Sequence, residues 1–382
     1  PVFWMSNKLG YGLIPHLAQF DAVSRVQELE GLLGVKELLP TAEAQAEAGK
    51  LAALKVGIND ASATAMANWK FFTLVLCMMA GTASLPHVLM RYFTTASVKA
   101  ARQSVGWSLL FICLLYLTAP ALATFTKLSL LDPTVATSII GKSISEVSNL
   151  EWIQQWSNVG FLKLVDGNGD GILQINEFFM RGDIVVLATP EIAGLPYVIS
   201  GLVAAGGMAA AMSTADGLVL AISNALSHDI YYKIINPKAE TAKRLIVARV
   251  LLFLIGFAGA SIAALEIQGI LGSVIWAFDF AMSGLFFPLV LGVWWKRANA
   301  PGAVAGMLLG LISGTAYLIW VRNGGAGFWG ITQLTFGIVG SLVSLVSMVV
   351  VSLMTKAPDS ATQKMVDEVR IPSGKAILGK QH

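Results

Sequence analysis

A series of long stretches without a charged side chain is the feature that most limits how this chain can fold. A helix needs about 20 apolar residues to cross the roughly 30 Å hydrocarbon core of a bilayer. Residues 71–90 and 103–126 contain no Asp, Glu, Lys or Arg, and five later stretches contain few. We therefore predict seven membrane spans, near residues 70–92, 103–126, 196–227, 243–265, 268–295, 302–321 and 329–354.

The composition agrees with a bilayer as solvent. Charged residues make up 13% of the chain, whereas soluble domains carry about 25%. This excludes a disordered chain, a nucleic-acid-binding protein and almost any water-soluble enzyme of this length. Buried helices of a soluble core are the less favoured alternative. Cys77 and Cys113 both lie in apolar runs, so neither a disulfide framework nor a zinc site is indicated.

The charge of the connections predicts the orientation of the spans, because basic short loops stay on the cytoplasmic side. The connections at 92–102, 228–249 and 296–301 are basic, whereas 127–191 holds more acids than bases. We expect a multi-pass protein of the cell inner (cytoplasmic) membrane with a cytoplasmic C-terminus. The expected segments are an outward loop segment at 1–68, two membrane helices at 69–127, an outward loop at 128–191, five membrane helices at 192–355 and a cytoplasmic tail at 356–382.

The third span is unusually rich in small residues from Gly201 onward, and Ser213, Thr214 and Asp216 lie near its centre. Hydroxyls in a membrane helix commonly bond to the carbonyl one turn back. The alternative is an alkali-cation site, in which hydroxyl and carbonyl oxygens replace the water around the ion. Asp216 favours a functional reading, since intramembrane acids are costly. Both readings stay open at this point.

Two other spans contain residues that interrupt helices. In the fifth span, Asp279 precedes Gly284 and Pro288, which predict a break, and broken helices line transport sites. A simple kink with Asp279 near the interface is the alternative. In the first span, Gly81 and Pro86 predict an unwound segment. His87 follows it, either as a proton or substrate contact or as a donor to a freed carbonyl.

Three segments resemble one family of transporters. Residues 292–312 resemble a signature of the sodium:solute symporter family and satisfy each of its fixed positions. Residues 212–216, followed by 228–231, resemble the family's eighth core helix and its inner end. Residues 81–87 and 90–93 resemble the acetate and short monocarboxylate permease branch. The resemblance covers roughly residues 69–355.

The resemblance implies an all-α polytopic membrane protein with the LeuT-type inverted-repeat transporter fold. This chain would hold the second repeat plus two peripheral helices, with an outward EF-hand-like loop. The first repeat would be missing, so the chain, which starts at Pro1, looks like an N-terminally truncated fragment of a longer transporter. The missing repeat would then be its partner.

The resemblance also implies site residues. Sodium ligands of the family correspond to the hydroxyls of Ser213 and Thr214 and the carbonyl of Ala210. The substrate would lie near Gly81, Thr82 and Asp279. Asp216 is a possible coupling residue.

The 128–191 loop contains a motif of its own, which fits the twelve-residue calcium loop of EF-hands. The ligand positions are filled by Asp166, Asn168, Asp170, Ile172 through its carbonyl, Gln174 and Glu177. Gly171 supplies the sharp turn. We expect a helix over 151–164 before this loop and an exit helix beginning at Phe178. An outward loop meets abundant calcium, so we expect a structural calcium ion rather than a sensor.

These features together predict sodium-coupled symport of a small organic solute, such as the short-chain monocarboxylate acetate. The expected partners are the lipid bilayer and the solute, with no nucleic acid. A proton-coupled transporter is an alternative, because Asp216 could titrate. A transporter-like membrane sensor is another. A membrane enzyme is not favoured, because no span clusters His, Cys or paired carboxylates.

Overall fold

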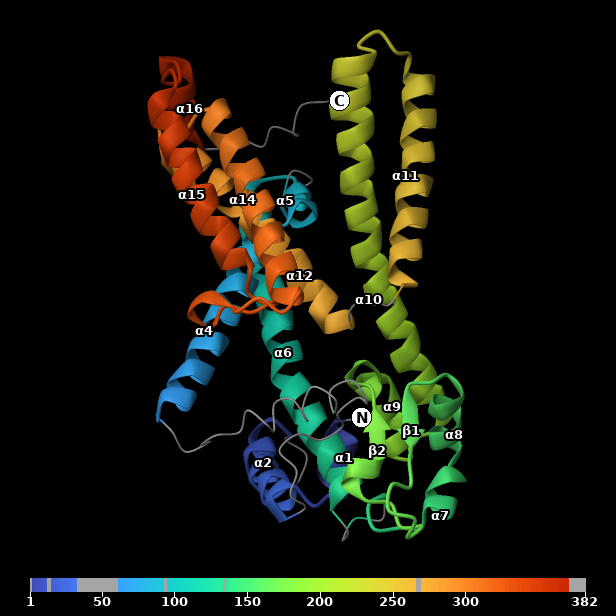
Figure 1. Ribbon diagram of the computed structural model, residues 1–382. Coiled ribbons are helices and arrows are strands. Elements are labelled where there is room, and N and C mark those ends of the chain that lie inside the picture. The colour runs from blue at the N-terminus through green and yellow to red at the C-terminus, as the bar shows by residue number, and fades with distance from the viewer. Residues whose placement is uncertain are drawn as a thin grey trace. The chain divides into compact units, whose positions relative to one another are not determined.

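The computed structural model describes residues 2–11, 15–32, 61–92, 95–132, 135, 137–265 and 269–370, and it is mainly helical (Figure 1). It divides into two compact units. One unit comprises residues 1–56 and 104–213, and the other comprises residues 57–103 and 214–382. Each unit is described by itself below.

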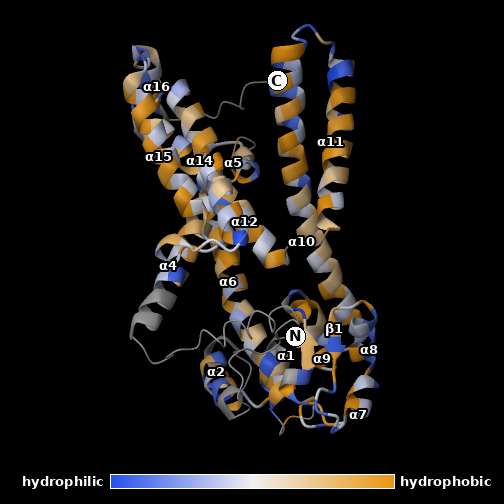
Figure 2. Ribbon diagram, in the orientation of Figure 1, coloured by the Kyte–Doolittle hydropathy of each residue, from blue (hydrophilic) through white to orange (hydrophobic). Residues whose placement is uncertain are grey.

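Among the described residues, six helical stretches are long and apolar enough to cross a membrane, and they match six of the seven predicted spans. They are α6 (Val98–Leu131), α10 (Tyr197–Asn224) continuing into the π-helical η3 (Ala225–Ile235), α11 (Thr241–Ala263), α12 (Ile270–Ala281) continuing through η4 (Met282–Phe286) and α13 (Phe287–Trp294), α14 (Ala300–Arg322) and α15 (Gly337–Met354). Figure 2 shows hydrophobic residues along most of these helices. Lipid is the solvent that suits such exposed apolar faces.

The first predicted span is two helices rather than one. Helix α4 (Ala61–Ala83) ends just before α5 (Pro86–Tyr92), and its apolar part covers Trp69–Ala83. The predicted interruption near Gly81 and Pro86 is thus confirmed. Proline has no backbone N–H and is well suited to the first turn of a helix. The Ser84 hydroxyl donates to the Ala80 carbonyl at 2.6 Å and so satisfies one of the last acceptors of α4.

The predicted break at Gly284 and Pro288 takes a milder form. The chain stays helical throughout 270–294, and residues 282–286 form a π-helical turn, η4. Such a turn absorbs one extra residue and commonly accompanies a function. The helix is locally widened here and does not unwind.

In the first unit, the segment expected as an outward loop contains two helices. Helices α1 (Val2–Lys8) and α2 (Pro15–Leu32) pack on the C-terminal part of α6. Their shared core includes Met5, Ala22, Val26, Phe125 and Leu128. The helix-prone stretch expected at 41–55 lies outside the described residues.

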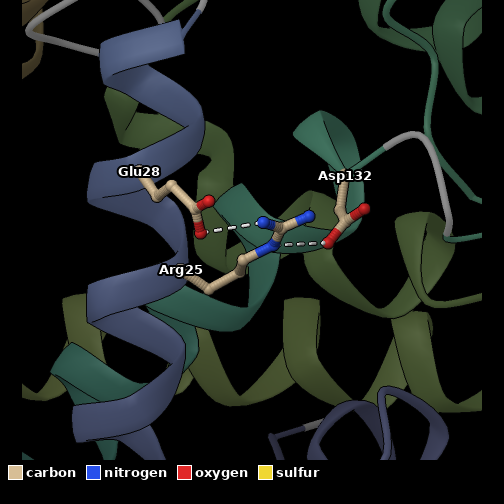
Figure 3. A network of polar contacts seen from close by, with 3 residues as sticks. All are labelled: Arg25, Glu28 and Asp132. Atoms are coloured by element: carbon tan, nitrogen blue, oxygen red, sulfur yellow. Dashed lines mark hydrogen bonds and ion pairs between the residues drawn. The ribbon is translucent and has the colours of Figure 1, made fainter.

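An ionic contact fixes α2 to the end of α6 (Figure 3). The Arg25 guanidinium donates to Asp132 at 3.3 Å and to Glu28, one turn along α2, at 2.8 Å. Asp132 is largely buried, so its carboxylate needs this partner.

Residues 144–192 form a small folded region with its own core. Its elements are α7 (Ile144–Ser148), α8 (Glu151–Asn158), β1 (Leu162–Leu164), η1 (Ile175–Glu177), β2 (Phe178–Met180), η2 (Gly182–Ile184) and α9 (Val185–Ile192). Strands β1 and β2 pair antiparallel, with Leu162 opposite Met180. The core gathers Leu130, Val147, Ile153, Leu173, Phe178, Ile184 and Ile192.

The predicted exit helix at Phe178 is therefore wrong. Residues 178–180 form a strand in which Phe178 and Met180 are buried and Phe179 is not, which is the two-residue period of a sheet. Likewise, the helix expected over 151–164 ends at Asn158 and gives way to β1. The calcium-loop motif thus lies in a β-hairpin, not between two helices.

In the second unit, a glycine at every fourth position lets α14 approach α15 closely. Gly302, Gly306, Gly310 and Gly314 are all buried. A Cβ on Gly306 would lie 3.0 Å from the Met348 Cβ. Spacing by four residues places these glycines on one helix face, where they form a groove for the partner helix.

Polar side chains connect the start of α14 with the end of α15. Asn299 caps α14 by accepting from the Gly302 N–H at 3.0 Å, and its amide donates to the Thr355 hydroxyl at 2.7 Å. The Arg297 guanidinium donates to the Thr355 carbonyl at 2.6 Å. After these residues, the tail forms α16 (Ser360–Arg370). An ion pair of 2.8 Å connects Asp367 of α16 with Lys296, which precedes α14.

Candidate functional site

The three sodium-ligand candidates lie on one helix, α10. Ala210, Ser213 and Thr214 are spaced by three and four residues, so they share a helix face. All three are exposed within the described residues, as is Asp216. One helix face can offer a sodium ion two hydroxyls and a carbonyl, which are hard oxygen ligands of the right type. Additional ligands have to come from another segment.

The substrate candidates Gly81 and Asp279 belong to helices in contact. A Cβ on Gly81 would lie 2.6 Å from the Cβ and the carbonyl oxygen of Phe278, the neighbour of Asp279. Gly81 therefore lets α4 and α12 approach. Thr82 differs, because its side chain is exposed and its hydroxyl donates to the Met78 carbonyl one turn back at 2.6 Å. Thr82 thus makes the ordinary back-bond of a membrane helix.

Asp279 is completely buried and lies against the start of α15. A Cβ on Gly337 would lie 2.8 Å from Oδ1 of this carboxyl group. Neither carboxyl oxygen makes a hydrogen bond of regular geometry within the described residues. The positive end of the α15 dipole is nevertheless a favourable place for a carboxylate. This position gives Asp279 a structural role beside any role in transport.

One turn further on, Ser283 lies in a hollow made by three glycines. Its hydroxyl donates to the Asp279 carbonyl at 2.7 Å, and the side chain is fully buried. A Cβ on Gly314 would lie 2.7 Å from the Ser283 Oγ, and one on Gly310 or Gly340 would clash with Ser283. This cluster is not among the residues predicted from the sequence, although the four-residue spacing of glycines at 302–314 is a signal for it.

The calcium candidates in the 166–177 loop are brought together. One carboxylate oxygen each from Asp166, Asp170 and Glu177 lies within 4.8 Å of the others. Glu177 is nearly buried and accepts from the N–H groups of Gly167 at 2.8 Å and Gln174 at 3.0 Å. Hydrogen bonds from the backbone thus hold Glu177, the last acidic position of the motif, next to the start of the loop.

Side chains in the middle of the loop also bond to its backbone. Asp170 accepts from the Ile172 N–H at 2.7 Å, and from the side-chain amides of Asn168 at 2.8 Å and Gln174 at 3.0 Å. The bond from Ile172, followed by that from Asn168, lowers the pKa of Asp170 from its usual value. Gly171 adopts φ +70°, which is the left-handed turn expected of this glycine.

The loop is anchored at Leu173, the residue after Ile172. Leu173 is fully buried, its N–H donates to the Lys142 carbonyl at 2.8 Å, and its carbonyl accepts from Gly141 at 2.8 Å. The donors present are hard oxygens, and they fit a calcium ion chemically. The flanking strands distinguish this loop from a helix–loop–helix EF-hand.

Comparison with known proteins places these residues in a family context. Residues 185–310 match the sequence model of the sodium:solute symporter family, and this match includes the sodium candidates on α10. A protein of Cupriavidus necator named an uncharacterized symporter is 41% identical over 310 residues, 78% of this chain and 44% of that protein. The monocarboxylic acid transporter of Corynebacterium glutamicum is 27% identical over 253 residues, 66% of this chain and 38% of that protein.

The chain spans less than half the length of these two relatives. Both relatives are named for transport, and the matched residues run from α9 into α14. Over residues 185–310, the chain is similar to the sodium:solute symporter family.

Proposed function

We propose that this protein takes up a short-chain monocarboxylate, such as acetate, by sodium-coupled symport. The observation that carries the proposal is the family match across α10, where Ala210, Ser213 and Thr214 share one face. The name of the Corynebacterium glutamicum relative supports a monocarboxylate as the solute class. Each sodium charge that moves inward gains about 2.3 kcal/mol per 100 mV of membrane potential.

The proposal includes the arrangement in the membrane. The second inverted repeat of a LeuT-type fold would comprise α4 to α13, with α14 and α15 peripheral. The basic connections at 92–102 and 228–249 would be cytoplasmic, as would the tail. Gly81, Thr82 and Asp279 would lie near the solute, and Asp216 would contribute to coupling.

Uptake of labelled acetate into proteoliposomes, with and without an inward sodium gradient, tests this function. We expect uptake to require the gradient, and we expect the double variant Ser213→Ala, Thr214→Ala to lose that dependence. Ser261→Ala is a matched control on α11, because its hydroxyl makes an ordinary back-bond to Phe257 at 2.8 Å. Sodium-dependent uptake that persists in the double variant would falsify the assignment of these hydroxyls.

Proton coupling through Asp216 is the second candidate. An acid within a membrane helix is a functional hypothesis by default, and Asp216 is exposed on α10 near the two hydroxyls. Acetate uptake driven by a pH gradient in sodium-free buffer, and abolished by Asp216→Asn, would favour this alternative over sodium.

We also propose that the 166–177 loop binds one structural calcium ion on the outer side. The gathered oxygens of Asp166, Asp170 and Glu177 support this proposal. Asn168, the Ile172 carbonyl and Gln174 would complete the ligand set. A calcium ion there would join the two ends of the β-hairpin loop and stabilise the small folded region around it.

A further inference from the structure

A cavity of about 580 Å³ lies between α5 and the C-terminal end of α10 with η3. It is lined by Pro86, His87 and Met90 from α5, and by Leu218, Ala221, Ile222, Asn224, Ala225, His228 and Asp229 from α10 and η3. Except for His87, which is a possible proton or substrate contact, none of these residues is a sodium or substrate candidate above. The cavity therefore has no role in the proposed function so far.

The α10 side of the cavity is a continuous helix face. Leu218, Ala221, Ile222 and Ala225 recur at intervals of three and four residues, and Thr214 precedes Leu218 by four. The cavity thus begins about one helical turn, roughly 5–6 Å, beyond the Thr214 hydroxyl along α10. A solute that leaves the level of Thr214 toward this end of α10 follows the face that lines the cavity.

The hydrogen position on His228 is determined by its neighbour on α11. The Arg244 guanidinium lies 3.3 Å from Nδ1 of His228 and stacks on the Tyr232 ring at 3.7 Å from its centroid. A guanidinium group has donors and no acceptor, so Nδ1 has to accept. A neutral His228 then carries its hydrogen on Nε2, which makes this ring a hydrogen-bond donor.

The acidic residue beside the cavity is already paired. The Asp229 carboxylate accepts from the Lys233 ammonium at 2.9 Å, one turn further along η3. This ion pair offsets the charge that would repel an anion. Besides Asp229, the polar side chains that line the cavity are His87, His228 and Asn224, while Met90 and Leu218 provide apolar surface.

We propose that this cavity is a second binding site for a small monocarboxylate, occupied on the cytoplasmic side of the transport cycle. The Nε2–H donor of His228 suits a carboxylate head, and the apolar lining suits a short alkyl tail. His228 is the main specificity-determining residue, and Arg244 and Tyr232 position its ring. The inference rests on the proposed function, because it takes the solute class and the orientation from it.

The test measures transport in both directions, with acetate and propionate as probes and the full-length protein in liposomes. His228→Phe removes the donor and keeps an aromatic ring, so we expect the KM for internal solute to rise about tenfold, as for a lost hydrogen bond to a charged group. The KM for external solute should change less than about twofold. His228→Asn retains an N–H donor and should recover most of the affinity.

A cavity-filling variant supplies an independent readout. Ala221→Trp should slow exchange of propionate more than of acetate, because the longer tail needs more of the cavity. Leu220→Trp is the matched control, since Leu220 is exposed on the opposite face of α10 and does not line the cavity. Comparable rates for both tryptophan variants would contradict a solute site here.

The outcomes separate the two proposals. If the unmodified protein transports neither acetate nor propionate, the proposed function fails and this inference fails with it. If transport is normal but His228→Phe changes both KM values equally, or neither, only the cavity assignment is overturned.

Discussion

Asp279 on α12 and Gly337, the first residue of α15, lie so close that a methyl group on Gly337 would come within 2.8 Å of the Asp279 Oδ1. This relationship joins a predicted substrate-lining helix to a helix that we propose to be peripheral. It places a fully buried carboxyl group at the positive end of α15. The Asp279 side chain is thus packed against the first turn of α15.

Gly337→Ala should destabilise the protein by about 1–3 kcal/mol, the usual cost of forcing an extra methyl group into a packed interior. Thermal unfolding of the purified protein in detergent measures this change. Gly256→Ala on α11 is the matched control, since nothing lies within 4 Å of its Cβ position. We expect the control to be neutral or slightly stabilising, because alanine favours helices more than glycine does. Equal unfolding temperatures for the two variants would contradict the close contact.

Gly310→Ala should disturb the packing around Ser283 and separate α14 from α15. The new Cβ would lie 2.7 Å from the Ser344 Cβ and would also clash with the Ser283 carbonyl. We expect a loss of about 1–3 kcal/mol and a lower yield of folded protein. Gly292→Ala on α13, which has nothing within 4 Å, should retain the normal yield. Fluorescence-detected size exclusion provides the comparison.

Asn299→Ala should lower the stability of the protein by about 1–2 kcal/mol. The change removes the cap of α14 and the hydrogen bond from the Asn299 side-chain amide to the Thr355 hydroxyl. Asn299→Asp separates the two contributions. Its carboxylate can still accept from the Gly302 N–H, but it cannot donate to Thr355. We therefore expect an intermediate loss of thermal stability, and a loss as large as that of alanine would show that the cap contributes little.

Millimolar calcium should raise the unfolding temperature of the purified protein if the 166–177 loop binds the ion. Extracellular calcium modules have Kd values of about 10⁻⁴–10⁻³ M, so 1 mM calcium, about 1–10 Kd, would add about 0.4–1.4 kcal/mol. Glu177→Gln should remove this effect, whereas Asp183→Asn, just outside the loop in η2, should retain it. Calorimetric titration that detects no heat at millimolar calcium would refute the site.

The loop should also loosen in acid. Because the pKa of Asp170 is lowered in the folded protein, its ionised form contributes stability above the ordinary aspartate pKa of about 3.9. That contribution is lost as the pH falls through the lowered value. The protection of the Ile172 amide against hydrogen exchange, measured without calcium and corrected for the intrinsic rate at each pH, should therefore decrease below about pH 4. Asp170→Asn should abolish this pH dependence, and an unchanged profile in the variant would assign the effect to another group.

Local features of this protein could be predicted from the sequence by itself. The membrane spans are determined by runs of apolar residues, because a helix in lipid satisfies its backbone bonds internally whatever its neighbours are. The six long spans followed from this rule, and the interruption before Pro86 followed from the helix-breaking residues Gly81 and Pro86. The loop around Asp170 could be predicted equally well, since its backbone contacts lie within twelve residues.

The tertiary structure decided what depends on residues far apart in the chain. Strand β2 exists because Phe178 and Met180 pack into a core shared with α7 and α9, which overrides the expected exit helix. Whether Asp279 contacts solute or caps α15 depends on where Gly337 lies, and no local pattern contains that distance. Apolar periodicity specifies that a helix is buried in lipid or protein, but the contact that each face makes is determined only by packing.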